Sequence, residues 1–203
     1  MGLPSGFVYL DAHVPGLVLD IRYHGPDNFL GRPVPGYEAP VCIVTLEAAE
    51  ALKGVQAEAA RQNRRLKIFD GYRPQCAVDE FIRWSQDADD QIAKADYYPN
   101  LDKRDLFDLG YLARRSSHSR GSTVDLTIID AQGHELDFGT PFDLFDPRSH
   151  TAHDTISPEA AAHRQWLLAL MGKHGFANIP EEWWHFTLKG EPFPDTYHNF
   201  PVR

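Results

Sequence analysis

One segment of the chain restricts its fold more strongly than any other. A Ser/Gly-rich turn at 116–122 leads into residues 122–129, where apolar and polar side chains alternate. A period of two predicts a strand with one apolar face, and it places Asp125 on the opposite face. The turn also carries His118, so a turn residue and a strand residue can converge on one point.

A second segment, 182–188, supplies the matching groups. It is aromatic and β-prone and is bounded by Pro180 and Gly190, so it predicts another strand. Residues three apart on a regular strand face opposite sides. We therefore expect Glu182 in the bend that precedes the strand and His185 inside the ladder.

These two segments together contain what a catalytic zinc site needs. Such a site commonly has three protein ligands and a water molecule in the fourth position. His118, Asp125 and His185 could serve as ligands, and Glu182 could take a proton from the water. Glu181, next to Glu182, could compete for the role of the base.

Each of these residues also has a structural explanation when it is taken alone. A single histidine is more often a hydrogen-bonded, partly buried side chain than a ligand, and Asp125 could simply accept a backbone hydrogen bond. Glu182 could be a solvated charge before an aromatic strand. Taken together, these residues are explained better by a metal site than by separate structural roles. The sequence therefore argues for a metallohydrolase.

Arg73 lies where a strand is followed by a helix. Residues 66–70 form a compact β-prone run, Gly71 ends it, and Pro74 can open the next helix. Attack on an amide carbonyl creates an oxyanion that a fixed guanidinium can stabilise. The alternatives are a structural salt bridge to Asp70 and a solvated loop arginine.

The rest of the chain predicts a scaffold. Thr45 caps a helix that extends toward Gln62, and a last helix opens at Ser157-Pro158 and closes at Gly175. A short strand and a long ordered loop occupy 18–37. Residues 85–108 show poor periodicity and predict an irregular segment.

Composition limits the class of protein. A chain of 203 residues is long enough for one core, so we expect a single domain over residues 1–203. The formal net charge of −9 and the lack of clustered Lys and Arg exclude nucleic acid as the expected partner. No apolar run is long enough to span a membrane. Small ligands are the expected partners.

The expected compartment is the cytoplasm. The first basic residue is Arg22, so no secretory signal is visible. The chain has only two cysteines, Cys42 and Cys76, which cannot form a dense disulfide framework. Cys76 has the position of a possible nucleophile, although a small buried side chain explains it better.

Three motifs resemble those of the VanX-type D-Ala-D-Ala dipeptidases, a branch of the zinc D,D-peptidases. They are Ser-Ser-His-Ser-Arg-Gly with the aspartate that follows (116–125), Glu-Trp-Trp-His (182–185) and Asp-Gly-Tyr-Arg-Pro (70–74). Residues 22–23 and 28–31 also resemble the family's N-terminal region. The resemblance in order, spacing and length covers most of the chain.

The resemblance implies an α+β fold with a central antiparallel sheet, flanking helices and a small, restricted cavity. It implies one Zn²⁺ held by His118, Asp125 and His185. Glu182 would be the general base and acid, and Arg73 would stabilise the tetrahedral intermediate.

Tyr23, Ser116 and Asp143 fall where the family holds the termini of the dipeptide. An acid suits the substrate ammonium, and a hydroxyl suits its carboxylate. Thr123 is a departure, because the broader zinc-peptidase pattern has Ala there, but this change removes no ligand.

The activity implied by the resemblance is hydrolysis of the small dipeptide D-Ala-D-Ala to two D-alanines. It would serve removal of a peptidoglycan precursor, as in vancomycin-type resistance, or salvage of the dipeptide. Two alternatives stay open: a D,D-carboxypeptidase or endopeptidase acting on longer muropeptides, and a non-catalytic zinc-binding domain. The sequence leaves the oligomeric state open.

Overall fold

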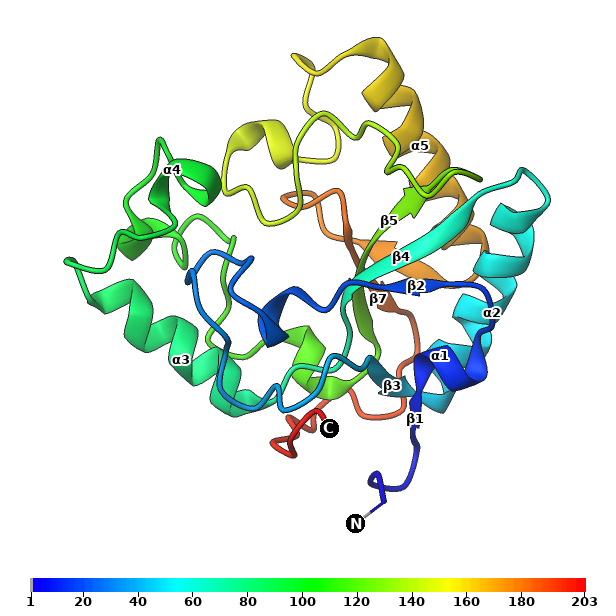
Figure 1. The fold of residues 1–203 in the computed structure, drawn as a ribbon, viewed down its shortest axis with the longest axis horizontal. Helices are drawn as coiled ribbons and strands as arrows, with labels where there is room; N and C mark the ends of the chain where they lie inside the picture. Colours follow the sequence, from blue (N-terminus) through cyan, green and yellow to red (C-terminus); the bar gives the residue numbers. More distant parts are fainter. Residues whose placement is uncertain (1) are drawn as a thin grey trace.

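The computed structural model describes residues 2–203 and is built on a five-stranded sheet with the order β2-β4-β5-β7-β6 (Figure 1). Strand β2 runs parallel to β4, and the other neighbours are antiparallel. The expected central antiparallel sheet is therefore confirmed, with one parallel strand at its edge. The strands are β2 (Val18–Leu19), β4 (Arg65–Asp70), β5 (Thr123–Ile129), β6 (Phe176–Asn178) and β7 (His185–Leu188).

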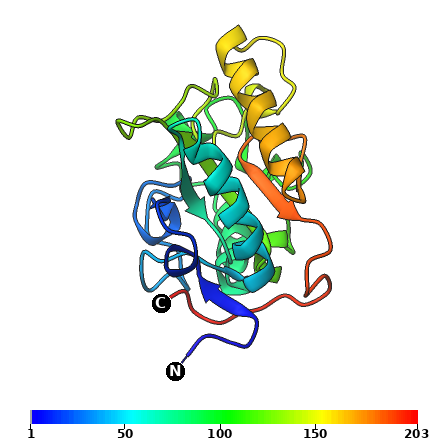
Figure 2. The ribbon, with the colours of Figure 1, turned by 90° about the vertical axis from the view of Figure 1, so that its right-hand side faces the viewer.

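Helices cover both sides of this sheet. Helix α2 (Leu46–Ala60) and helix α5 (Pro158–Lys173) lie side by side on one side, as Figure 2 shows. Helix α3 (Gln75–Gln86) and the short α4 (Lys94–Tyr97) lie on the other side with long loops (Figure 1). The sheet is thus covered on both faces, and the α+β prediction is confirmed.

The two long helices begin where the sequence predicts. The Thr45 side chain accepts from the backbone N–H of Ala48 at 3.3 Å and caps α2. The Ser157 side chain does the same for Ala160 at 3.0 Å and caps α5, with Pro158 in the first turn. Both helices thus begin at a satisfied N-terminal cap.

The predicted strand at 122–129 needs one correction. It forms β5, but all seven of its residues are buried instead of one face only. The reason is its position: β5 is the third of five strands and is covered from both sides. Asp125 therefore lies in the interior of the protein.

The predicted strand at 182–188 is shorter than expected. Strand β7 begins at His185, and the residues before it form a turn. Glu182 lies in this bend and His185 lies inside the ladder, as predicted. His185 pairs there with Asp125 of β5.

Several short elements complete the fold. Strands β1 (Phe7–Tyr9) and β3 (Ile43–Thr45) form a separate antiparallel pair that the sequence analysis did not predict. Helix α1 (Leu10–His13) follows β1, and four 3-10 turns interrupt the loops. These turns are η1 (Arg22–His24), η2 (Lys103–Asp105), η3 (Ser117–Arg120) and η4 (Pro147–Ser149).

One contiguous hydrophobic core joins these elements. The segment 85–108 is irregular apart from the last two residues of α3, helix α4 and turn η2, yet Tyr98 and Leu106 are fully buried in that core. Among residues 2–203, no helix has the length and apolar character needed to cross a membrane.

Candidate metal centre

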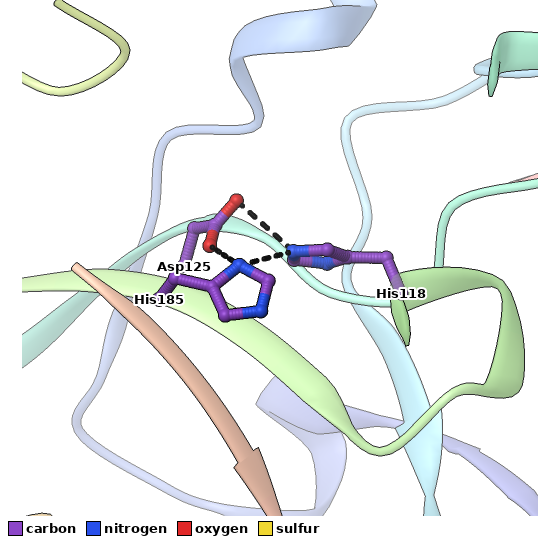
Figure 3. A group of neighbouring side chains, drawn as sticks. All are labelled: His118, Asp125 and His185. Atoms are coloured by element: carbon purple, nitrogen blue, oxygen red, sulfur yellow. Dashed lines mark hydrogen bonds and ion pairs between the residues drawn. The ribbon is translucent and has the colours of Figure 1, made fainter. Parts of the chain in front are cut away.

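Three neighbouring structural elements bring His118, Asp125 and His185 together (Figure 3). His118 lies in turn η3, Asp125 lies in β5, and His185 is the first residue of β7. The antiparallel register pairs Asp125 directly with His185. Turn η3 ends at Gly121, whose φ of +89° is open to glycine and rare for other residues.

The three side chains face one another at short distances. His118 Nε2 lies 3.3 Å from Asp125 Oδ2, and His185 Nδ1 lies 3.2 Å from Asp125 Oδ1. The two ring nitrogens are 3.2 Å apart, and one ligand atom from each residue lies within 4.8 Å of the others. All three side chains can therefore reach a single cation.

The outward nitrogens of both rings have partners. His118 Nδ1 lies 2.7 Å from the carbonyl oxygen of Gly71, and His185 Nε2 lies 3.2 Å from Ser117 Oγ. A carbonyl oxygen can only accept, so Nδ1 carries the proton and Nε2 presents a lone pair to the centre. Metal-binding histidines are typically held in this way.

The chemistry of this donor set fits a metal ion. Asp125 is 2 % exposed, and its buried Oδ1 atom lies 3.2 Å from His185 Nδ1 but has no hydrogen bond of favourable geometry. A buried carboxylate oxygen without a partner is costly, and a bound cation removes that cost. Two imidazole nitrogens and one carboxylate are ligands that Zn²⁺ accepts.

Glu182 lies beside the cluster as a spare carboxylate. Its Oε2 atom is 3.5 Å from His185 Nδ1. Burial raises the pKa of Glu182 well above its ordinary value, and the charges of Asp125 and Asp143 add to this effect. Glu181, the other candidate base, does not line the cavity.

Arg73 contacts both the scaffold and the cluster. Its Nε atom donates to Asp70 Oδ2 at 2.9 Å, and one Nη atom donates to Asp125 Oδ2 at 3.4 Å. The guanidinium carbon lies 4.9 Å from the ring centre of Tyr23 and 5.2 Å from that of Phe81. The salt bridge to Asp70, which is the structural alternative for Arg73, is present, and the same residue lines the cavity.

The three predicted substrate-binding residues lie at the same cavity. Tyr23 donates its hydroxyl proton to Asp143 Oδ2 at 2.7 Å. Burial and then the charge of Asp125 raise the pKa of Asp143 to about 8. Ser116 caps turn η3 by accepting from the backbone N–H of His118 at 3.3 Å.

A cavity of about 260 Å³ unites these groups. The expected ligands, base, oxyanion donor and substrate-binding residues all line it: Tyr23, Arg73, Ser116, His118, Asp125, Asp143, Glu182 and His185. The sequence analysis missed part of the loop at 110–115, which also lines the cavity. That loop has no periodic pattern or motif that could have indicated it.

The enclosed His-Asp-His cluster with a spare carboxylate, set against a mixed sheet, is the arrangement of a zinc metallopeptidase. Residues 4–203 match the peptidase M15 family model described as "D-ala-D-ala dipeptidase". The chain belongs to this family. The family resemblance suggested by the motifs is thereby confirmed.

Curated relatives agree over the full length of the chain. The D-alanyl-D-alanine dipeptidase of Enterococcus faecalis is 43 % identical over 201 residues, which is 98 % of this chain and 100 % of the relative. The dipeptidase of the same name from Streptomyces coelicolor is 45 % identical over 201 residues, with the same coverage. A solved structure of the D,D-pentapeptidase VanY with Zn(II) is more distant, with a TM-score of 0.45, 15 % identity, and coverage of 76 % of this chain and 77 % of VanY.

Proposed function

We propose that residues 1–203 form one zinc-dependent domain that hydrolyses D-Ala-D-Ala to two D-alanines. Family membership over 4–203 supports the reaction. The observation that carries the proposal is the small cavity, because every residue needed for this reaction lines it. Its volume of about 260 Å³ suits a dipeptide better than a long muropeptide.

His118, Asp125 and His185 would hold the Zn²⁺ ion in this proposal. Zinc supplies a Lewis acid that polarises a carbonyl and lowers the pKa of bound water to about 7. The protein's contribution is orientation: the Gly71 carbonyl fixes the tautomer of His118, and Ser117 holds the outward nitrogen of His185.

Glu182 is assigned the proton transfers. As general base it takes a proton from the attacking water, and as general acid it then passes that proton to the leaving amine. A base works best when its pKa lies near the working pH, and burial moves the pKa of Glu182 upward from its ordinary value. Its position next to His185 suits both steps.

Stabilisation of the oxyanion is assigned to Arg73. The acidic groups around it outweigh the effect of burial and raise the pKa of Arg73 well above its ordinary value, so the guanidinium stays charged. Its Nε atom and one Nη atom are used by Asp70 and Asp125, which leaves the other Nη atom for the cavity. A fixed donor of this kind contributes about 10²–10³ in rate.

The termini of the dipeptide are assigned to the remaining residues. Asp143, hydrogen-bonded to Tyr23, suits the free ammonium, because the positive charge of that group would favour the ionised carboxylate. The Ser116 hydroxyl suits the carboxylate of the dipeptide. A requirement for a free ammonium separates a dipeptidase from a D,D-carboxypeptidase or endopeptidase. A non-catalytic zinc domain is the weaker alternative, because Glu182 is present beside the metal cluster.

We propose a cytoplasmic enzyme that serves either vancomycin-type resistance or dipeptide salvage. Both roles use the same reaction, and the residues of the cavity favour neither. Growth of a deletion strain separates them: a resistance enzyme affects survival on vancomycin, whereas a salvage enzyme affects growth on the dipeptide.

A substrate panel tests the reaction. Zinc-loaded protein is given D-Ala-D-Ala, L-Ala-L-Ala or N-acetyl-D-Ala-D-Ala, and amine release is measured. Cleavage of the free D,D-dipeptide alone supports the proposal. Preference for the acetylated peptide would indicate a carboxypeptidase, and no cleavage of any peptide by zinc-loaded protein would contradict the dipeptidase function.

A further inference from the structure

A buried row of three polar side chains leads to the cavity. The Tyr37 hydroxyl donates to Asp70 Oδ1 at 2.7 Å, and Asp70 Oδ2 accepts from Arg73 Nε at 2.9 Å. Their exposed fractions are 6 %, 1 % and 7 %. Of the three, only Arg73 lines the cavity, and the Tyr37 hydroxyl is joined to it through its hydrogen bond to Asp70.

The backbone holds Tyr37 in place. The N–H groups of Glu38 and Ala39 donate to the carbonyl of Val202 at 2.8 and 3.0 Å, and the Val202 N–H donates to Gly36 at 2.8 Å. These bonds anchor the loop on both sides of the tyrosine. The Tyr37 ring also packs against Tyr23, with the ring centres 5.7 Å apart.

The direction of the hydrogen bond from Tyr37 is defined. Burial and the neighbouring Asp70 charge raise the pKa of Tyr37 well above its ordinary value, so its hydroxyl keeps its proton. The carboxylate can only accept. Without this hydroxyl, Asp70 Oδ1 would be left unpaired in a dry site, and the Asp70 side chain would lose one of the contacts that hold it.

Asp70 and Asp125 are the two carboxylates that fix how Arg73 faces the cavity, and Asp70 makes the shorter contact. Because its carboxylate holds the Nε edge of the guanidinium, the plane of that group cannot rotate freely between the Tyr23 and Phe81 rings. A misplaced donor stabilises an oxyanion poorly even when its charge is unchanged.

We propose that Tyr37 is a positioning residue, which acts through Asp70 to hold the Arg73 guanidinium in the orientation that the reaction requires. The consequence for catalysis rests on the proposed function. The orientation of Arg73 itself does not, and it can be measured separately.

The kinetic test uses Tyr37→Phe, which removes only the hydroxyl. We expect kcat for D-Ala-D-Ala to fall by about 10- to 100-fold while KM changes by less than about twofold, since the oxyanion forms after binding. In the Arg73→Ala background, the same substitution should lower kcat no further. Additive losses would overturn the proposal, because they would show that Tyr37 acts independently of Arg73.

The chain offers a matched control outside the cavity. Tyr97 donates to Asp27 Oδ1 at 2.8 Å, and Asp27 Oδ2 accepts from Arg22 at 2.8 Å, so the same three residue types form a similar row there. Tyr97 does not line the cavity. Tyr97→Phe should leave kcat unchanged; a loss as large as that of Tyr37→Phe would mean that any lost tyrosine hydroxyl lowers activity, and would overturn the proposal.

A second readout does not depend on activity. The Nε–H proton of Arg73 is observed by proton–nitrogen NMR and assigned by its loss in Arg73→Lys. In the unmodified protein we expect this proton to exchange slowly with water. In Tyr37→Phe its signal should shift and its exchange should become faster, whereas in Tyr97→Phe neither should change. An unchanged signal in Tyr37→Phe would overturn the proposal. If the protein cleaves no peptide, the dipeptidase function fails, and this signal alone decides the role of Tyr37.

Discussion

His118 Nδ1 donates to the carbonyl oxygen of Gly71 at 2.7 Å, and this bond links a candidate metal ligand to the segment that carries Arg73. Gly71 lies directly after β4, and Arg73 follows two residues later. The Arg73 N–H in turn donates to the His118 carbonyl at 3.3 Å. The candidate metal centre and the segment that carries Arg73 are therefore connected by two hydrogen bonds.

Substitution of either histidine should remove the metal. His118→Ala or His185→Ala takes away one of the three proposed ligands, so zinc affinity should fall by more than about 100-fold. Zinc content after dialysis is the measurement, with His134→Ala as the control, because His134 is a surface residue with a side chain that is 79 % exposed. A histidine variant that keeps stoichiometric zinc would remove that residue from the ligand set.

Glu182→Gln should separate metal binding from catalysis. The amide keeps the shape of the side chain but cannot take the proton, so we expect normal zinc content and a kcat lower by about 10²–10⁴. Glu181→Gln is the matched control, since Glu181 does not line the cavity. Retained activity in Glu182→Gln, together with its loss in Glu181→Gln, would move the base role to the neighbour.

Asp143→Asn should stabilise the metal-free protein in a pH-dependent way. Burial and the charge of Asp125 raise the pKa of Asp143 from 3.8 to about 8, so the folded state binds this proton more tightly than the unfolded state. The contribution of Asp143 to the free energy of unfolding is therefore most favourable below pH 4 and is lost as the pH rises through about 8.

The amide variant lacks this titration and can still accept the hydrogen bond from Tyr23. Asparagine also tolerates the backbone φ of +59° at position 143. In the presence of a chelator, thermal unfolding should show Asp143→Asn more stable than the unmodified protein at pH 9, with the difference disappearing near pH 4. A difference that does not vary with pH would contradict the raised pKa.

Gly121→Ala should weaken the centre through the backbone. Gly121 ends the turn that carries His118 at a φ of +89°, and an added Cβ would meet the Phe7 ring. We expect the free energy of unfolding to fall by about 1–3 kcal/mol from the backbone strain alone, and zinc binding to be weaker. Gly133→Ala is the control, because it has a φ of +91° with no atom within 4 Å of the added carbon. Urea unfolding measures the free energy of unfolding of both variants. Equal losses in Gly121→Ala and Gly133→Ala would show that contact with Phe7 causes no further destabilisation.

Local patterns predicted the main elements and the candidate site. The caps at Thr45 and Ser157 are predicted from neighbouring residues in the sequence. The alternation in 122–129 indicates a strand independently of the elements that pack on it. Family motifs added Tyr23 and Asp143, which lie 120 residues apart and meet in one hydrogen bond. No periodicity could have predicted that contact.

What the sequence analysis missed depends on tertiary contacts. Strands β1, β3 and β6 have three residues each, too few to show a period. The second buried face of β5 results from the loops and helices that cover it. Tyr37 meets Asp70 across 33 residues through a loop with no repeating pattern.

The most direct test of the account is a zinc titration of the metal-free protein with D-Ala-D-Ala as substrate. If His118, Asp125 and His185 form one catalytic zinc site, turnover should be absent without metal, rise in proportion to added zinc, and stop rising at one equivalent per chain. Full turnover in the metal-free protein, or no turnover at one bound equivalent, would contradict the account.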